Sequence, residues 1–278
     1  MYDVLLYSMN TKARQNYKKK AKHRTRIQLF IIYLQKIGNM PNDYFRFKQF
    51  SIHHDRCAMK VGTDGVLLGA WGCVDGKRIL DIGTGTGLIA LMSAQRNPVA
   101  QVLGIDIDEQ AISQARENVA RSPFCNRVNC IGQDILTYQS ATSFDAILCN
   151  PPFFTEDTLP DDTGRAIARN SKCLPFSDLI RKVSCLLADE GTFSVIIPYL
   201  SMTEFIACCL SEGLHLCRRC IVRTTARKPP RRVLLSFSKC YANSNATGQE
   251  EVMCLSSDDG GRSNDYKELT KDFYLWLC

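Results

Sequence analysis

Residues 81–87, Asp-Ile-Gly-Thr-Gly-Thr-Gly, have the composition of a loop that lets a ligand approach the backbone. Glycine at every second position (Gly83, Gly85 and Gly87) allows a sharp turn and removes the Cβ atoms that would keep a ligand away. The apolar run at 77–81 predicts a strand before the loop, and residues 88–95 predict a helix after it. A strand, a glycine loop and a helix in this order are typical of a cofactor-binding turn.

The acids around this loop indicate which cofactor it binds. Asp106, nineteen residues after Gly87, ends the next expected strand, where a carboxylate can accept hydrogen bonds from both ribose hydroxyls. A dinucleotide-binding Rossmann enzyme is the alternative, but the pattern is GxGxG rather than GxGxxG. Asp81 would also repel a diphosphate, whereas it suits a cofactor with a cationic sulfonium and an amino-acid tail. We therefore predict that the cofactor is S-adenosylmethionine.

Asp134 ends the third expected strand, at 128–131, and Ile135 follows it. A carboxylate here can accept the N6 hydrogens of an adenine, and an apolar neighbour can line a purine pocket. An Asp after a strand is also a common helix cap. Because ligands of open α/β sheets collect at the carboxyl ends of the strands, we place both residues in the cofactor site.

The tetrapeptide Asn150-Pro151-Pro152-Phe153 follows the fourth expected strand, at 144–149. An exocyclic ring amine is a poor nucleophile because its lone pair is delocalised. The Asn150 side-chain oxygen and the Pro151 carbonyl can accept its two N–H bonds and favour the pyramidal geometry that attacks a methyl group. The prolines fix this backbone, and Phe153 can stack on the base, a contact worth ~1–3 kcal/mol. We predict that all four are catalytic and that Asn150 also contacts the cofactor.

Strands and helices alternate from residue 77 to residue 212, which predicts a mostly parallel sheet covered on both faces. Helices are expected at 109–120, 176–188 and 201–212, with strands at 101–106 and 192–198. Strands near 217–223, 232–239 and 250–255 follow without a helix between them and predict an antiparallel hairpin at one edge. A helix near 265–275 closes the chain. The expected fold class is α/β, of the Rossmann-like methyltransferase type.

Positive charge is concentrated at the N-terminus. Residues 1–39 contain nine Lys or Arg and one Asp, so they contribute +8 to a net charge of +7, and 40–278 sum to −1. A general argument from basic charge to nucleic acid therefore fails. We expect 1–39 to be a basic extension that is disordered or precedes the true start at Met40, with an RNA-gripping arm as the alternative. Residues 40–278 are expected to form the methyltransferase domain.

The composition excludes several classes of protein. The 14 scattered cysteines indicate reduced thiols of a cytoplasmic protein rather than a disulfide framework. Cys217 and Cys220 have no matching second pair, so we expect no metal. No apolar run approaches the ~18 residues of a membrane span, and 27–34 is followed by no signal-peptide cleavage site. No obligate protein partner is evident.

A local basic cluster remains a candidate RNA surface. Between Arg218 and Arg232 there are seven basic residues and no acid. A charge run is usually a solvated face, but the rest of the domain is not basic, and such a cluster suits phosphate contacts that position RNA. The residues predicted to contact RNA are Arg165, Arg169, Arg223, Arg227, Lys228, Arg231 and Arg232.

Several stretches resemble a known family. The glycine loop, Asn-Pro-Pro-Phe and residues 45–50, 58–71 and 269–275 are similar to the bacterial tRNA1(Val) adenine-N6 methyltransferases. The resemblance covers about 40–278. It implies a seven-stranded methyltransferase fold and methylation of the adenine 3′ to the anticodon of a valine tRNA, so that the anticodon stem-loop is the partner. It also implies that the segment around 60–64 folds over the methionine end of the cofactor, with Thr63 and Asp64 in contact.

Related activities use similar chemistry and remain alternatives. Glutamine-N5 methyltransferases of release factors carry an N-terminal helical bundle and favour Tyr where this chain has Phe153. Ribosomal-RNA guanine-N2 methyltransferases usually have a duplicated domain, and DNA adenine methyltransferases need a target-reading domain. A non-catalytic RNA-binding module is the other class, but Gly83, Gly85, Asp106 and Asn150 are intact.

Overall fold

The computed structural model of the chain describes residues 43–55, 61–152, 175–240 and 250–275. All of these except Asp43 belong to one compact unit, Tyr44–Cys278. The prediction for residues 1–39 lies outside the described residues.

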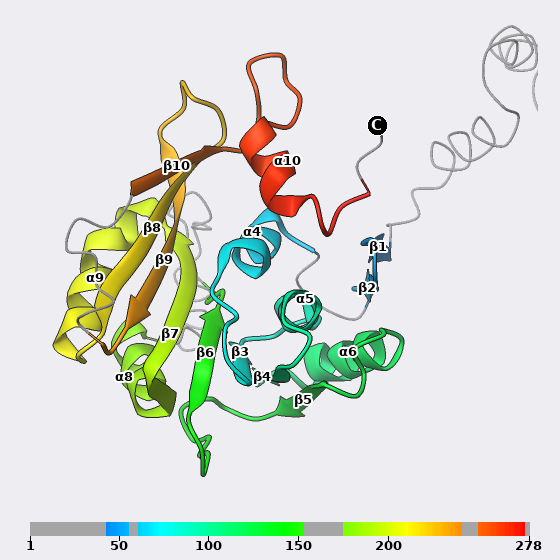
Figure 1. Cartoon of the computed structure of the whole chain (residues 1–278), viewed down its shortest axis with the longest axis vertical. Coiled ribbons are helices and arrows are strands. Elements are labelled where there is room, and N and C mark those ends of the chain that lie inside the picture. The colour runs from blue at the N-terminus through cyan, green and yellow to red at the C-terminus, as the bar shows by residue number, and fades with distance from the viewer. Residues whose placement is uncertain (1–42, 56–60, 153–174, 241–249, 276–278) are drawn as a thin grey trace, which may run out of the picture. The chain divides into compact units, whose positions relative to one another are not determined.

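An eight-stranded sheet forms the centre of this unit (Figure 1). Its strands are β3 (Arg78–Ile82), β4 (Gln101–Asp106), β5 (Val128–Gly132), β6 (Phe144–Cys149), β7 (Leu187–Pro198), β8 (His215–Arg223), β9 (Pro230–Ser238) and β10 (Glu250–Cys254). Their spatial order is β10-β8-β9-β7-β6-β3-β4-β5. β9 runs antiparallel to both of its neighbours, and every other neighbouring pair is parallel. The expected hairpin is thus β8–β9, and β10 lies outside it as an eighth strand.

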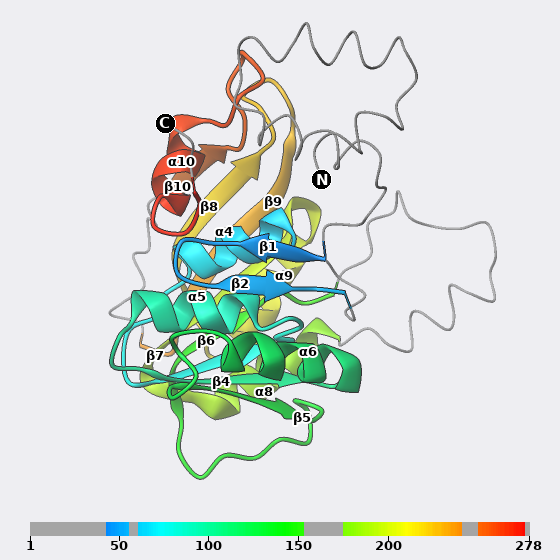
Figure 2. The same cartoon turned by 90° about the vertical axis from the view of Figure 1, so that its right-hand side faces the viewer.

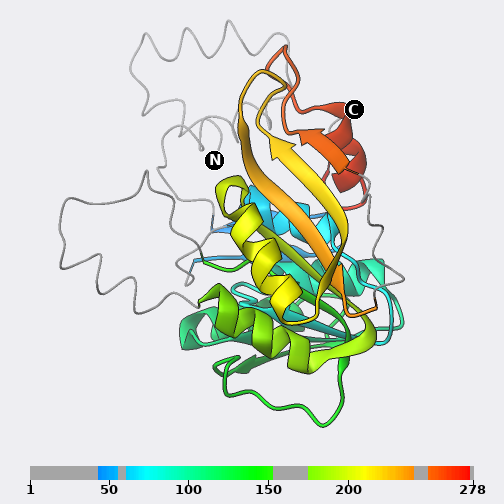
Figure 3. The same ribbon diagram turned by 90° about the vertical axis from the view of Figure 1, so that its left-hand side faces the viewer.

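Helices cover both faces of the sheet. One face is covered by α4 (Thr63–Trp71), α5 (Leu88–Arg96), α6 (Glu109–Ala120) and α10 (Asn264–Thr270), and the other by α8 (Phe176–Leu186) and α9 (Met202–Ser211) (Figures 1 and 3). Successive residues of β3 pack into opposite cores: Ile79 against the first group of helices, Leu80 against the second. A strand buried on both faces is apolar throughout, which is why the runs were recognisable in the sequence.

The N-terminal hairpin region of this unit contacts residues 273 and 274. β1 (Tyr44–Arg46) and β2 (Ser51–His53) form a separate antiparallel hairpin (Figure 2). The ring of Phe47 stacks on Tyr274, with centroids 5.7 Å apart, and the backbone N–H of Lys48 donates to the carbonyl of Phe273 at 2.8 Å. The stretches 45–50 and 269–275 therefore belong to one structural feature, an aromatic clasp.

The α/β class is confirmed, but some elements differ from the expectation. The helix α4 was not expected, because seven of its nine residues are buried and it has no polar stripe to give a helical period. α8 ends at Leu186, and β7 begins directly after it rather than at 192. A short 3₁₀ helix, η2 (Tyr199–Ser201), follows β7.

The clasp makes a prediction about stability. Phe273 is 2% exposed, so Phe273→Ala leaves a cavity and should lower the free energy of unfolding by about 3 kcal/mol. Leu275→Ala, two residues away at 53% exposure, is the control and should change it by less than about 0.5 kcal/mol. Urea unfolding measures both. Equal effects of the two substitutions would contradict the packing role of Phe273.

Candidate active site

The glycine loop adopts a backbone conformation that only glycine tolerates well. Gly83, Gly85 and Gly87 have φ angles of 69°, 54° and 82°, in the left-handed region that L side chains rarely enter. A Cβ atom added to Gly83 would meet no atom within 4 Å. The space beside the loop is therefore open, and the glycines serve the turn itself.

That open space is a cavity of about 380 Å³. Its wall is built from the N-terminal turn of α4, the glycine loop, the start of α5 and the residues after β6. Because β3 and β6 are paired neighbours, their carboxyl ends place the glycine loop beside Asn150. The predicted site residues that line the cavity are Thr63, Asp64, Gly83, Gly85, Asn150, Pro151 and Pro152.

Asp81 lies at the base of the loop and is fully buried. Its Oδ2 accepts hydrogen bonds from Thr84 Oγ1 at 2.6 Å and from the Ala90 N–H at 3.1 Å, while Oδ1 has no hydrogen-bond partner among the described residues. Burial raises the pKa of this carboxyl to about 7; the two hydrogen bonds oppose the rise, and the charge of Asp106 adds to it. Asp81 is outside the cavity lining, but Thr84, which it holds, is part of it.

Asp106 ends β4 and is bound to the loop. Its Oδ2 accepts the Gly85 N–H at 2.8 Å, and its Oδ1 accepts the Asp108 N–H at 3.0 Å. This carboxylate therefore has a fixed orientation next to the cavity. Ile107, the following residue, is 73% exposed, which is unusual for a large apolar side chain at the carboxyl end of a sheet. The sequence argument missed Ile107; an apolar residue directly after a strand-end acid was the available signal.

Asp134 and Ile135 follow β5, the neighbour of β4. Asp134 Oδ1 accepts the Leu136 N–H at 2.9 Å, so this carboxylate caps a turn at 135–137, where the alternative interpretation expected a helix. Ile135 is 6% exposed and packs in the core beneath. Neither residue lines the cavity, and their contact with an adenine stays a prediction.

Asn118 on α6 connects the glycine loop to the β1–β2 hairpin. It was not among the residues predicted from the sequence. It is fully buried. Its Nδ2 donates to the carbonyls of Thr86 and His53, and its Oδ1 accepts the His53 N–H, all at 2.9 Å. A single amide side chain thus fixes the loop, a helix and the hairpin relative to one another.

Three arginines of the basic run 218–232 have acidic partners. Arg218 makes a two-point contact with Glu251, and Arg219 pairs with Glu250. Arg232 Nε donates to Asp64 Oδ2 at 2.8 Å. Arg223 is half-buried, and its guanidinium donates to the Ala226 carbonyl at 3.4 Å.

Besides Arg218, the exposed basic residues of the run are Arg227, Lys228 and Arg231. They lie in or beside the turn between β8 and β9. β8 points in the same direction as β3 and β6, so this turn leaves the sheet at the same edge as the glycine loop. The predicted residues Phe153, Arg165 and Arg169 lie outside the described residues.

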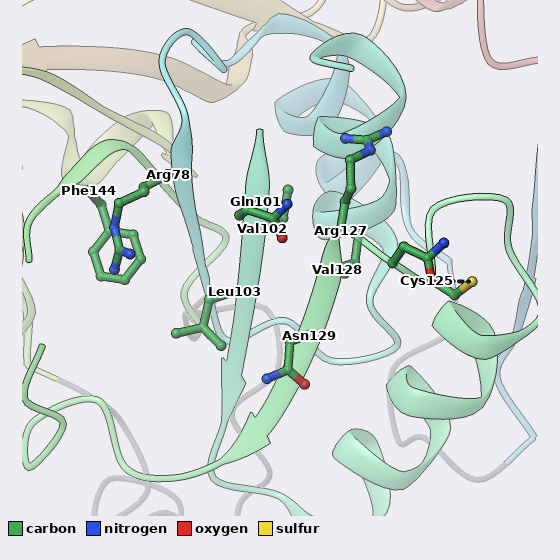
Figure 4. Close-up of a pocket in the computed structure, with 10 residues that line it drawn as sticks. Arg78, Gln101, Val102, Leu103, Cys125, Arg127, Val128, Asn129 and Phe144 are labelled. Atoms are coloured by element: carbon green, nitrogen blue, oxygen red, sulfur yellow. Dashed lines mark hydrogen bonds between the residues drawn. The ribbon is translucent and has the colours of Figure 1, made fainter. Parts of the chain in front are cut away.

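A second cavity, of about 390 Å³, lies at the opposite edge of the sheet (Figure 4). It is lined by the first residues of β3 to β6 and by the segment before β5. Arg78 lies over the Phe144 ring at 5.0 Å, and Arg127 donates to the carbonyls of Ala94, Asn97 and Ala100. Both guanidiniums are thus engaged in the fold, and ligands of such sheets collect at the other edge.

The two cysteines of the CxxC motif lie on β8, and neither lines the first cavity. Cys220 is buried, which raises the pKa of its thiol to about 12, and Cys217 is half-buried. Within the described ranges, no three His, Cys, Asp or Glu side chains are grouped as a metal site requires. No helix in that part of the chain has the length and apolarity to cross a membrane.

The chain is similar in sequence to known methyltransferases. Residues 63–175 match the family model of the methyltransferase small domain. A tRNA1(Val) (adenine(37)-N6)-methyltransferase of Bacteroides thetaiotaomicron is 45% identical over 241 residues, 86% of this chain and 100% of that protein. The protein of the same name from Vibrio campbellii is 40% identical, over 83% of this chain and 95% of its own length.

Among solved structures, a predicted O-methyltransferase from Agrobacterium tumefaciens has a TM-score of 0.55 at 19% identity. It covers 76% of this chain and 96% of that one. At this identity the likeness extends to the fold alone.

Asp81 predicts a pH dependence of stability. Its pKa is about 7 in the folded chain against an ordinary value of 3.8, so between these values the folded state holds a proton that the unfolded state releases. The free energy of unfolding should therefore fall as pH rises, by about 1 kcal/mol per pH unit from this group between pH 5 and 6, and level off above pH 8.

Asp81→Asn keeps an acceptor for Thr84 and Ala90 but does not titrate, so it should lose that part of the slope. Urea unfolding from pH 5 to pH 8 measures the free energy of unfolding of the native protein and of Asp81→Asn. The contributions of the other titrating groups cancel in the difference between the two proteins. If the free energies of unfolding of the two proteins changed in parallel with pH, the raised pKa of Asp81 would be refuted.

Proposed function

Because the chain belongs to the tRNA1(Val) (adenine(37)-N6)-methyltransferase family, we propose that it transfers a methyl group from S-adenosylmethionine to the N6 amine of an adenine in tRNA. The observation that carries this function is the cavity that brings Asn150, Pro151 and Pro152 beside the glycine loop. The adenine is the one 3′ to the anticodon of a valine tRNA, so the anticodon stem-loop is the part bound, and the reaction takes place in the cytoplasm. The relatives that are 45% and 40% identical are named for the adenine-N6 activity rather than for the release-factor or guanine-N2 activities.

The residues around the cavity fit the methyl donor. The glycine loop leaves room for a ligand at its backbone. Asp81 brings a carboxylate with an unused oxygen to the base of the loop, which favours a cation nearby. Asp106 is oriented to accept ribose hydroxyls, and the exposed side chain of Ile107 gains by contact with a planar ring. When bound, S-adenosylmethionine supplies an electrophilic methyl group on a sulfonium.

Asn150, Pro151 and Pro152, which follow β6, orient the N6 amine of the substrate adenine. The side-chain oxygen of Asn150 and the carbonyl of Pro151 accept its two N–H bonds and orient its lone pair towards the methyl group. The proline rings hold both acceptors in place before the substrate arrives, and Pro151 is buried, which restricts it further. A strong general base is unnecessary, because the amine proton becomes acidic after the methyl group has been transferred.

The turn between β8 and β9 contacts the RNA. Arg227, Lys228 and Arg231 are exposed at the edge of the sheet that holds the cavity, where phosphates of a bound stem-loop pass close to the reacting adenine. Such contacts position RNA without reading its sequence. The base enters the cavity after it is extruded from its stack, and Phe153 stacks on it.

Asn150→Ala tests the catalytic proposal. Loss of one preorganised acceptor should lower kcat by about 10²- to 10³-fold. The measurement is transfer of labelled methyl from S-adenosylmethionine to total tRNA, followed by nucleoside analysis for N6-methyladenosine. Asn126→Ala, an exposed asparagine lining the second cavity, is the control and should keep the native rate. Label in protein instead of tRNA, or an unaffected rate in Asn150→Ala, would defeat the proposal.

Arg227→Ala with Arg231→Ala tests the RNA contact. Removal of two phosphate contacts should weaken tRNA binding and reduce the slope of log affinity against log salt by about 2. Affinity for S-adenosylmethionine should not change. Arg121→Ala removes an exposed arginine at the end of α6 and is the matched control. A tRNA affinity and salt slope equal to those of the control would remove this turn from the interface.

A further inference from the structure

Arg232 contacts Asp64 in the wall of the cavity, in contrast to Arg231, the other arginine at the start of β9. Its Nε donates to Asp64 Oδ2 at 2.8 Å, and its Nη1 donates to the carbonyl of Arg231 at 3.0 Å. The side chains of Arg232 and Asp64 are 22% and 28% exposed. This pair joins residues 168 positions apart in the sequence.

We propose that Arg232 is a positioning residue of the methyl-donor pocket, which holds Asp64 in the cavity wall, and is not a contact for RNA phosphates. The inference rests on the proposed function, because it assigns the cavity to S-adenosylmethionine. It replaces the phosphate contact that the basic run predicted for this residue.

The backbone of Arg232 is well placed for this role. β9 lies between β7 and β8, and Arg232 is paired with Pro198 on one side and with Val222 on the other. The backbone of Arg232 therefore has little freedom. Arg231 is exposed and nearer the turn, so the two neighbouring arginines serve different surfaces.

Asp64 needs a partner of this kind. It lies in the first turn of α4, where the helix dipole favours its charge but does not fix its rotamer. A guanidinium bound both to Asp64 and to the carbonyl of Arg231 gives the carboxylate one orientation along the wall. A cationic ligand in the cavity then meets a carboxylate that is already ordered, so binding costs less conformational entropy.

The test measures binding of S-adenosylmethionine by calorimetry in the absence of tRNA. Arg232→Ala should raise the Kd for S-adenosylmethionine by about threefold to tenfold and leave the Kd for tRNA within about twofold. In steady-state assays its KM for S-adenosylmethionine should rise while kcat stays near the native value. Arg232→Lys keeps a donor and a charge and should recover part of the affinity. Arg231→Ala is the neighbouring control, with the opposite expectation: weaker tRNA binding and native affinity for S-adenosylmethionine.

A double-mutant cycle shows whether Arg232 acts through Asp64. In an Asp64→Asn background, Arg232→Ala should weaken binding of S-adenosylmethionine by less than about twofold further. Additive effects would overturn the proposal, as would a loss of tRNA affinity in Arg232→Ala that matches Arg231→Ala. Urea unfolding checks that each variant is folded, and Arg232→Lys carries the comparison if Arg232→Ala is not.

The outcomes also separate this inference from the function itself. A native protein that binds S-adenosylmethionine but does not methylate tRNA would refute the proposed substrate and leave the result for Arg232 standing. A native protein that does not bind S-adenosylmethionine would refute both.

Discussion

The site depends on a backbone that enters the left-handed region three times within five residues, at Gly83, Gly85 and Gly87. The loop's amides are directed at the end of the next strand: the N–H groups of Gly83 and Thr84 donate to the Ile105 carbonyl, and that of Gly85 donates to Asp106. Since a Cβ at Gly83 would meet no neighbour, the requirement for glycine is one of conformation rather than of space. The turn fixes the start of α5, the direction of Asp106 and the wall of the cavity together.

Asp81 is the least favourable group in this arrangement. A buried carboxylate with an unpaired oxygen costs stability, and the nearby charge of Asp106 increases that cost. Two features reduce it. Thr84 donates a short hydrogen bond, and the Ala90 N–H belongs to the first turn of α5, where the helix dipole favours negative charge. Stability alone would favour an apolar residue at this position, so the acid is a local conflict of the kind that proteins retain at functional sites.

The sequence predicted what depends on local pattern. β4, β6 and α6 begin and end where expected because their apolar period is clear, and the rule that parallel strands share a carboxyl edge brought Asn150 to the glycine loop. Features that depend on contacts between residues far apart in the sequence could not be predicted in this way. α4 has no polar stripe, so its helical period is hidden. Asn118 contributes through three hydrogen bonds to distant backbone, and no local signal in the sequence of α6 indicates them.

The basic run shows why charge in a sequence does not equal charge on a surface. Arg218 and Arg219 face acids of β10, a strand some thirty residues later that pairs in parallel with β8. Arg218 also lies over the ring of Trp71 at 4.2 Å, so it contacts both β10 and α4. The eighth strand thus does more than shield the edge of β8. By pairing the arginines along the strand, it leaves the free positive charge on the turn at the carboxyl edge of the sheet. A polyanion is attracted to the charge that remains after such pairing, and that charge lies at the edge where the cavity is.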